Sequence, residues 1–332
     1  MSELWSRLGF LAIALVVYRI GTHIPIPGIN PEQVAALFQQ SQGTILQYFN
    51  LFSGGALERM SIFALSVVPY ISSAIVMQLF SNSVPYLQEL KKDGQAGRNK
   101  ITQYTRYGTV IFALIQSSAL TVTLQTAGLI DAGSIFSAFV AVISIVTGTM
   151  FLMWLGEQIS ERGIGNGISI IIATSIITGV PRAFGQALEQ TQQGDLNYLL
   201  LIVLAVLTLL VVAFVVFVEN AQRKITVNYA QRNQVRGMIQ APSSFLPLKL
   251  NMSGVIPAIF ASTFLLFPAS LSSWFGNIDG LGGLQEFSLY LNPGQPLYIL
   301  LFVILIVSFC YIWPALTFSS NDIAENLKKG GA

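Results

Sequence analysis

Long apolar runs alternate with short polar segments along the whole chain, and most of the runs are long enough to cross a lipid bilayer. A helix needs about 20 apolar residues to span the hydrocarbon core. Eight runs of that order lie at Leu8–Ile24, Ser61–Phe80, Tyr107–Leu129, Ile135–Leu155, Ile168–Gln186, Tyr198–Val218, Gly254–Phe275 and Tyr298–Leu316. Because unpaired backbone groups are costly in lipid, the pattern predicts an all-α polytopic membrane protein with eight transmembrane helices.

Positive charge is distributed unevenly between the segments that connect these runs. With the N-terminus in the cytoplasm, 14 of the 17 Lys and Arg residues fall in cytoplasmic segments. They are Arg7, Lys91, Lys92, Arg98, Lys100, Arg106, Arg162, Arg223, Lys224, Arg232, Arg236, Lys249, Lys328 and Lys329. Since Lys and Arg collect on the cytoplasmic side of membrane proteins, we expect both the N-terminus and the last loop to be cytoplasmic.

The composition agrees with a membrane protein and argues against several other classes. Hydrophobic residues make up 53% of the chain and charged residues 10%, whereas a soluble domain carries about 25% charged residues. The net charge of +2 is too small to favour nucleic-acid binding. Cys310 is the only cysteine and His23 the only histidine, so neither an internal disulfide nor a His/Cys metal site is expected. No Walker-type loop or catalytic constellation is present, and we expect neither an enzyme nor a cofactor.

One apolar segment, Ile45–Met60, is too short to cross the bilayer as a helix. It is interrupted by Gly54-Gly55 and by the charged pair Glu58-Arg59. One interpretation is an amphipathic helix on the outer leaflet. The other is a re-entrant element in a pore, because irregular backbone is tolerated at membrane depth only where it is buried in protein or lines a cavity.

Two pairs of branched apolar residues recur at helical spacing in different predicted spans. Val67 and Ile71 are four residues apart, and Ile168 and Ile172 repeat this spacing, so each pair lies on one helical face. Ordinary helix packing accounts for most such pairs. An apolar constriction that gates a pore by dewetting is the alternative.

Sequence stretches spread over the whole chain resemble the SecY family, which forms the channel of the Sec translocon. They are IPIPGI at Ile24–Ile29, LFSGGALERMSIFAL at Leu51–Leu65, PYISSAI at Pro69–Ile75, QYTRYGT at Gln103–Thr109, GTMFLMWLGEQISERGIGNGISIII at Gly148–Ile172, VNYAQR at Val227–Arg232, LPLKLNMSGVIPAIFAS at Leu246–Ser262, NPGQPLY at Asn292–Tyr298 and ENLKKGGA at Glu325–Ala332. These stretches are long and follow the order of the family. The resemblance implies a passive channel that conducts unfolded secretory proteins and releases membrane proteins sideways into the bilayer.

The resemblance also implies roles for the two ambiguous features. The family's plug, a short helix that closes the channel from the outer side, corresponds to residues 49–60 of this chain. The matching plug residues are Phe49, Phe52, Ser53, Gly54, Gly55, Leu57 and Arg59. The family's ring of apolar pore residues corresponds to Val67, Ile71, Ile168, Ile172 and Ile259.

The same resemblance implies a lateral gate, a docking face and a set of partners. The gate opens between the second and third spans on one side and the seventh and eighth on the other, with polar positions at Gln78 and Asn166. The cytoplasmic segments 220–253 and 319–332 match loops that dock the SecA motor or a ribosome. The basic residues of that docking face are Arg223, Lys224, Arg232, Arg236 and Lys249. The implied partners are SecE and SecG, SecA or a ribosome, signal peptides and nascent chains, and the lipid bilayer, with SecDF and YidC beside them and no nucleic-acid contact beyond ribosomal RNA.

Members of the family have ten spans in two inverted halves of five. The resemblance therefore implies an N-terminal half over residues 1–186 and an incomplete C-terminal half over residues 187–332 that lacks the last two spans. It also implies a location in the bacterial cytoplasmic membrane. A multispanning secondary transporter is the alternative class, and a membrane scaffold without a pore is a third. No predicted span carries Asp, Glu or Lys near its middle, which counts against a proton-coupled carrier and leaves sodium coupling open.

Overall fold

The computed structural model describes residues 2–29, 33–34, 50, 53–126, 128–130, 135–194, 197–227, 244–262, 264–265, 295–317 and 320–329. Within these ranges the chain is mostly helical, as the apolar pattern predicts. The chain divides into two compact units. Unit 1 comprises residues 1–186 and 262–302, and unit 2 comprises residues 187–261 and 303–332.

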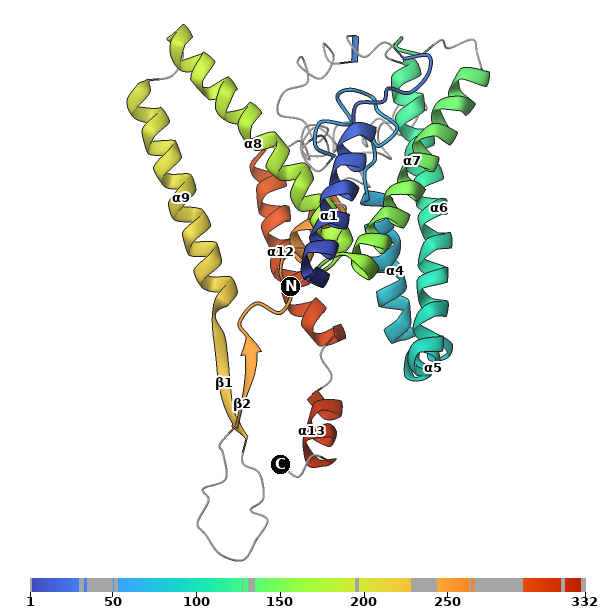
Figure 1. Cartoon of the computed structure of the whole chain (residues 1–332), viewed down its shortest axis with the longest axis vertical. Helices are drawn as coiled ribbons and strands as arrows, with labels where there is room; N and C mark the ends of the chain where they lie inside the picture. Colours follow the sequence, from blue (N-terminus) through green and yellow to red (C-terminus); the bar gives the residue numbers. More distant parts are fainter. Residues whose placement is uncertain are drawn as a thin grey trace, which may run out of the picture. The chain divides into compact units, whose positions relative to one another are not determined.

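The helices of unit 1 form one layered bundle (Figure 1). They are α1 (Ser2–Gly21), α4 (Val68–Ser83), α5 (Pro85–Lys92), α6 (Gly94–Thr126), α7 (Ile135–Arg162) and α8 (Gly167–Gln193), whose last turns belong to unit 2. Helices α4 and α5 pack against α6, and both α6 and α1 pack against α7.

Small residues let these helices approach closely. A Cβ added at Gly108 of α6 would overlap the hydroxyl of Ser73 on α4. That hydroxyl donates a hydrogen bond of 2.7 Å to the carbonyl of Thr105, again on α6. Because lipid tails are as apolar as the side chains, helices in a membrane associate through such close packing and interhelical hydrogen bonds.

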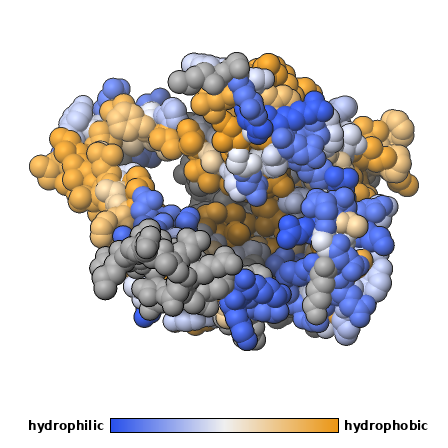
Figure 2. All heavy atoms as spheres, turned by 60° about the horizontal axis from the view of Figure 1, so that its bottom comes forward, coloured by the Kyte–Doolittle hydropathy of each residue, from blue (hydrophilic) through white to orange (hydrophobic). Residues whose placement is uncertain are grey.

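Unit 2 contains the most exposed apolar helix of the described chain. Its elements are α9 (Tyr198–Asn220), β1 (Gln222–Val227), β2 (Ser244–Lys249), most of α12 (Pro296–Thr317) and α13 (Ser320–Lys329). The side chain of Asn197 caps α9 by accepting a hydrogen bond from the amide of Leu199 at 3.3 Å. No residue of α9 is buried, and Figure 2 shows its apolar surface in orange. A helix that is apolar all round suits a lipid environment.

Most predicted spans correspond to helices in the structure. Six helices of the described chain are long and apolar enough to cross a membrane, namely α1, α6, α7, α8, α9 and α12. The second predicted span, Ser61–Phe80, becomes helical only at Val68, where Pro69 occupies the first turn of α4. Proline is favoured in that position because the first helical N–H has no intrahelical partner. The seventh predicted span is described only in its first part and otherwise lies outside the described residues.

A two-stranded antiparallel ribbon accompanies the helices. Strands β1 and β2 pair with Arg223 opposite Leu248 and Gln222 opposite Lys249. The strands belong to the segment that the sequence analysis treated as a cytoplasmic loop. Ile225, Thr226 and Val227 are β-branched residues of the kind that favour a strand.

Candidate functional site

Residues 53–67, named the turn segment below, follow one another as turns between the N-terminal part of the chain and α4. Gly54 and Gly55 have φ angles of +66° and +82°. Only glycine adopts this left-handed region without a steric cost, so the Gly-Gly pair permits the reversal of the chain. The backbone amide of Gly55 donates to the carbonyl of Asn50 at 2.9 Å. The Asn50 side chain pairs with the amide and carboxylate of Glu58 at 3.0 Å each, which closes the loop.

The far end of the turn segment is held by the proline-rich turn that follows α1. The amide of Ile26 donates to the carbonyl of Met60 at 2.8 Å, and the amide of Ile62 donates to the carbonyl of Ile24 at 3.0 Å. Pro25 and Ser61 form an isolated antiparallel bridge between the two hydrogen bonds. The turn segment is therefore held against the rest of the protein through its own main chain. Its residues 53–60 form turns and not the short helix that the resemblance implies for residues 49–60.

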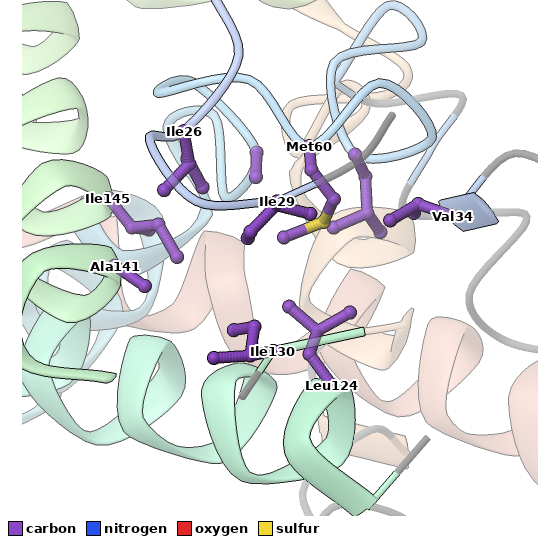
Figure 3. Close-up of a cluster of buried hydrophobic side chains, with 10 residues drawn as sticks. Ile26, Ile29, Val34, Met60, Leu124, Ile130, Ala141 and Ile145 are labelled. Carbon is purple, nitrogen blue, oxygen red and sulfur yellow. The ribbon is translucent and has the colours of Figure 1, made fainter. Parts of the chain in front are cut away.

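An apolar cluster, named the outer cluster, covers one side of the turn segment (Figure 3). Leu57 and Met60 of the turn segment are 3% and 0% exposed. Figure 3 shows Met60 lying between Ile29 and Val34. The remaining buried members come from the turn segment, the proline-rich turn, the end of α6 with the turn that follows it, and α7, and they are Ala64, Ile26, Leu124, Ile130, Ala141 and Ile145.

A second apolar cluster, named the inner cluster, contains four of the five predicted ring residues. Val67 precedes α4 and is 1% exposed, and Ile71 lies one turn further on. Ile168 and Ile172 occupy the first two turns of α8 and pack against the same cluster. The structure thus brings together two pairs that are about 100 residues apart in sequence.

The inner cluster is completed by residues of the turn segment and of three helices. Ala56 and Phe63 of the turn segment are 0% and 3% exposed. The ring of Phe63 stacks between those of Tyr18 and Phe151, with centroid distances of 6.2 and 5.9 Å. The other buried members are Ala14, Leu152, Leu155, Ile159 and Ile171. Ile259, the fifth predicted ring residue, is buried and belongs to unit 2.

Polar contacts join α1 and α8 to the first two residues of the turn segment. The hydroxyl of Tyr18 donates to the carbonyl of Ser53 at 3.3 Å and is hydrogen-bonded to the hydroxyl of Ser175. The guanidinium of Arg19 donates to the carbonyl of Gly54 at 3.2 Å and to Thr178 Oγ1 at 3.5 Å.

None of these four side chains was predicted from the sequence to contact the turn segment. Serine and threonine inside an apolar span are read as ordinary helix contacts. The available signal is the i, i+3 spacing of Ser175 and Thr178, which places both hydroxyls on one face of α8.

A tight turn between α7 and α8 positions Ile168. Asn166 is the N-cap of α8, because its side-chain oxygen accepts from the amides of Ile168 and Ser169 at 3.1 and 3.2 Å. A Cβ added at Gly167 would overlap the carbonyl oxygen of Gly156 on α7. The start of α8 is therefore fixed against the last turns of α7 by direct backbone contact.

The remaining predicted site residues lie on separate elements. Asn166, one of the two predicted gate positions, is exposed, and Gln78 is half-buried on α4. Arg223 and Lys224 on β1 and Lys249 on β2 are exposed, so the ribbon carries part of the predicted docking face. Four predicted residues lie outside the described ranges, namely Phe49, Phe52, Arg232 and Arg236. Among the described residues no group of three or more His, Cys, Asp or Glu side chains is arranged to hold a metal ion.

The apolar helices, together with a buried irregular segment packed against them, define a polytopic helical membrane protein. The SecY family model matches residues 61–332. The chain is 58% identical to protein translocase subunit SecY of Pseudomonas aeruginosa over 332 residues, covering 100% of this chain and 75% of that protein. It is 54% identical to protein translocase subunit SecY of Escherichia coli K12 over 336 residues, covering 100% and 76%. The chain belongs to the SecY family.

Solved structures with the same fold are protein-conducting channels. One such channel matches with a TM-score of 0.64 and 18% identity, covering 94% of this chain and 72% of that chain. Sec61 in the canine ribosome–channel complex from the endoplasmic reticulum matches with a TM-score of 0.65 and 17% identity over 98% and 76%. A SecY structure concerned with the plug domain, which stabilises the closed state of the channel and maintains a membrane seal, matches with a TM-score of 0.60 and 19% identity over 82% and 58%.

These comparisons confirm the resemblance and the mostly helical fold class that the sequence analysis derived. SecY relatives are translocase subunits, so the chain belongs to a family of channels and not of enzymes. The alternative of a secondary transporter receives no support. The division into inverted halves and the roles of the individual site residues stay predictions.

Proposed function

We propose that this chain forms the central pore of a Sec translocon, a passive channel for unfolded preproteins and for membrane proteins that leave it sideways. The observation that carries the proposal is the inner cluster, in which Val67, Ile71, Ile168 and Ile172 meet residues of the turn segment. The chain's relatives at 54–58% identity are protein translocase subunits. In this proposal the four residues, with Ile259, form the pore ring, and residues 53–60 of the turn segment belong to the plug, residues 49–60, that is seated on it.

An apolar ring suits the passage of many different chains. Branched aliphatic side chains make non-directional contacts, so they surround an extended polypeptide without reading its sequence. The same side chains disfavour a continuous water column when the pore is empty, which limits ion leakage by dewetting. A signal peptide, itself an apolar helix, would enter beside Gln78 and Asn166 and shift the channel toward its open state by binding that state more tightly.

The energy for transport would come from a partner. Exposed Arg223, Lys224 and Lys249 on the β1–β2 ribbon, with Arg232 and Arg236 in the same loop, offer a basic surface for SecA or for ribosomal RNA. SecE and SecG would complete the channel, and SecDF and YidC would act beside it. The excess of positive charge in the connecting segments supports a cytoplasmic N-terminus in the bacterial inner membrane.

Site-specific photocrosslinking of a stalled secretory precursor tests the proposed pore. A photoreactive residue at Ile172 should crosslink to the precursor, because this side chain belongs to the inner cluster. The matched control is Ile177, which lies on the same helix and is 66% exposed on its outer surface. Position 177 should crosslink to lipid and not to the precursor. Equal crosslinking of the precursor at both positions, or at neither, would contradict the proposed path.

A further inference from the structure

Four side chains hold the main chain of the turn segment from two helices, and they are named the latch: Tyr18 and Arg19 on α1, and Ser175 and Thr178 on α8. Each α1 donor contacts one carbonyl of the turn segment and one hydroxyl of α8. Tyr18 bridges Ser53 and Ser175, and Arg19 bridges Gly54 and Thr178. The carbonyls of the adjacent residues Ser53 and Gly54 thus accept hydrogen bonds from the side chains of the adjacent residues Tyr18 and Arg19.

The Tyr18 side of the latch has little access to water, whereas Arg19 and Thr178 are half-buried. Tyr18 and Ser175 are both 0% exposed, and Ser53 is 1% exposed. Gly54 fits closely, since an added Cβ would lie 3.2 Å from Ser175 Cα and 3.3 Å from both Thr178 Oγ1 and Tyr18 Oη. Hydrogen bonds are stronger in a site of low dielectric than in water, so these contacts favour the seated conformation.

We propose that the latch sets how readily the turn segment leaves its seat, so that its four side chains are positioning residues for channel closure. This inference rests on the proposed function. The turn segment is held by its backbone carbonyls, and both α1 donors also have a partner on α8. When the turn segment moves away, Tyr18 retains Ser175 and Arg19 retains Thr178, while the freed carbonyls reach water. Unseating therefore leaves no buried donor of the latch without a partner, and the contact is reversible.

The substitution Tyr18→Phe isolates one contact of the latch. The phenyl ring keeps its stacking on Phe63, and the hydroxyl of Ser175 keeps its own hydrogen bond of 2.8 Å to the carbonyl of Ile171. The hydroxyl of Tyr18 loses its contacts with the Ser53 carbonyl and with the Ser175 hydroxyl, and only the first of these holds the turn segment. One hydrogen bond of ordinary net strength corresponds to about a 2- to 13-fold change in an equilibrium constant. The matched control is Tyr107→Phe. The hydroxyl that it removes accepts a hydrogen bond from Gln103 on the exposed surface of α6.

The assay uses the protein assembled with its translocon partners in planar bilayers and proteoliposomes. Resting ion conductance should rise about 2- to 13-fold in Tyr18→Phe and stay unchanged in Tyr107→Phe. Maleimide labelling of Leu57→Cys, in a Cys310→Ala background, should accelerate by a similar factor because Leu57 is buried when the turn segment is seated. A merely structural role of Tyr18 would lower the melting temperature and leave the labelling rate of the folded protein unchanged.

A second pair of variants keeps the test independent of one substitution. Thr178→Val removes the α8 partner of Arg19, and Thr174→Val removes a hydroxyl that bonds to the carbonyl of Ile170 in its own helix. Thr178 orients the half-buried guanidinium of Arg19 toward the carbonyl of Gly54, so its loss should weaken that contact with the turn segment. Conductance should therefore rise in the first variant and not in the second. Unchanged conductance and labelling in both Tyr18→Phe and Thr178→Val would overturn the latch. Translocation of a precursor by the unsubstituted protein is measured in the same vesicles, and its failure would reject the proposed function while the conductance ratios still decide the latch.

Discussion

The contact between α7 and α8 allows a sharp prediction about the position of the proposed pore ring. A methyl group added by Gly167→Ala would overlap the carbonyl oxygen of Gly156 and lie 2.7 Å from Cβ of Ile159. The first of these obstacles is backbone, which does not rotate away as a side chain does. The start of α8 must therefore shift, and the ring residues Ile168 and Ile172 must shift with it. Overpacking of this kind costs about 1–3 kcal/mol.

Gly185→Ala is the matched control, because Gly185 lies on the same helix and an added Cβ has nothing within 4 Å. Alanine is the better helix former by about 1 kcal/mol, so this variant should be neutral or more stable. Thermal unfolding in detergent should show a lower melting temperature for Gly167→Ala and an equal or higher one for Gly185→Ala. Resting conductance should change only in Gly167→Ala. If both variants melt and conduct alike, the close approach of the two helices does not position the ring.

Three further predictions concern buried hydroxyls, orientation and docking. Thr149→Val should leave the free energy of unfolding unchanged or raise it by about 1 kcal/mol, because the buried hydroxyl of Thr149 has no hydrogen-bond partner in the described chain. Thr109→Val should lower the free energy of unfolding by about the same amount, because the hydroxyl of Thr109 donates to the carbonyl of Thr105 at 2.8 Å. Thermal unfolding of the two variants measures the difference. Lys91→Cys in a Cys310→Ala background should react with an impermeant maleimide only after the inner membrane face is exposed, and labelling in intact spheroplasts would reverse the assigned orientation. Neutralising Arg232 and Arg236 together should weaken the binding of SecA or of a ribosome and leave membrane insertion intact. The effect should be largest at low salt, because attraction between exposed charges is screened over about 8–10 Å at physiological salt. An affinity equal to that of the unsubstituted protein would mean that these charges serve membrane orientation alone.

The sequence predicts the helices well wherever an apolar run is also a helix. The run Tyr198–Val218 corresponds to α9, which ends at Asn220. The run that begins at Ser61 misplaces the start of α4 by seven residues, because residues 61–67 are mostly apolar and yet do not form a helix. Hydropathy does not distinguish a buried turn from a buried helix. The difference is decided by tertiary contacts, such as the bridge between Ser61 and Pro25, which link positions that no local window contains.

The candidate site is predictable to a similar degree. The i, i+4 spacing of Val67 with Ile71 and of Ile168 with Ile172 identifies two faces, and only the fold shows that both faces meet in the inner cluster. The latch is out of reach of pattern analysis for another reason. It uses carbonyl groups of Ser53 and Gly54, which every residue possesses, so the sequence carries no sign of the acceptors.

In the proposed function the turn segment must close a channel and also leave it, and burial and backbone strain act in opposite directions on its seated state. Burial of Leu57 and Met60 in the outer cluster favours the seated state by about 1.5–3 kcal/mol each. Against this, Met60 and Ser66 have φ angles of +43° and +51°, and non-glycine residues held in this region cost about 1–3 kcal/mol each. The strain offsets part of the gain from burial, to which Ala56 and Phe63 of the inner cluster also contribute. The hydrogen bonds of the latch add to the seated state, and a signal peptide would shift the balance by as much as it binds the open state more tightly.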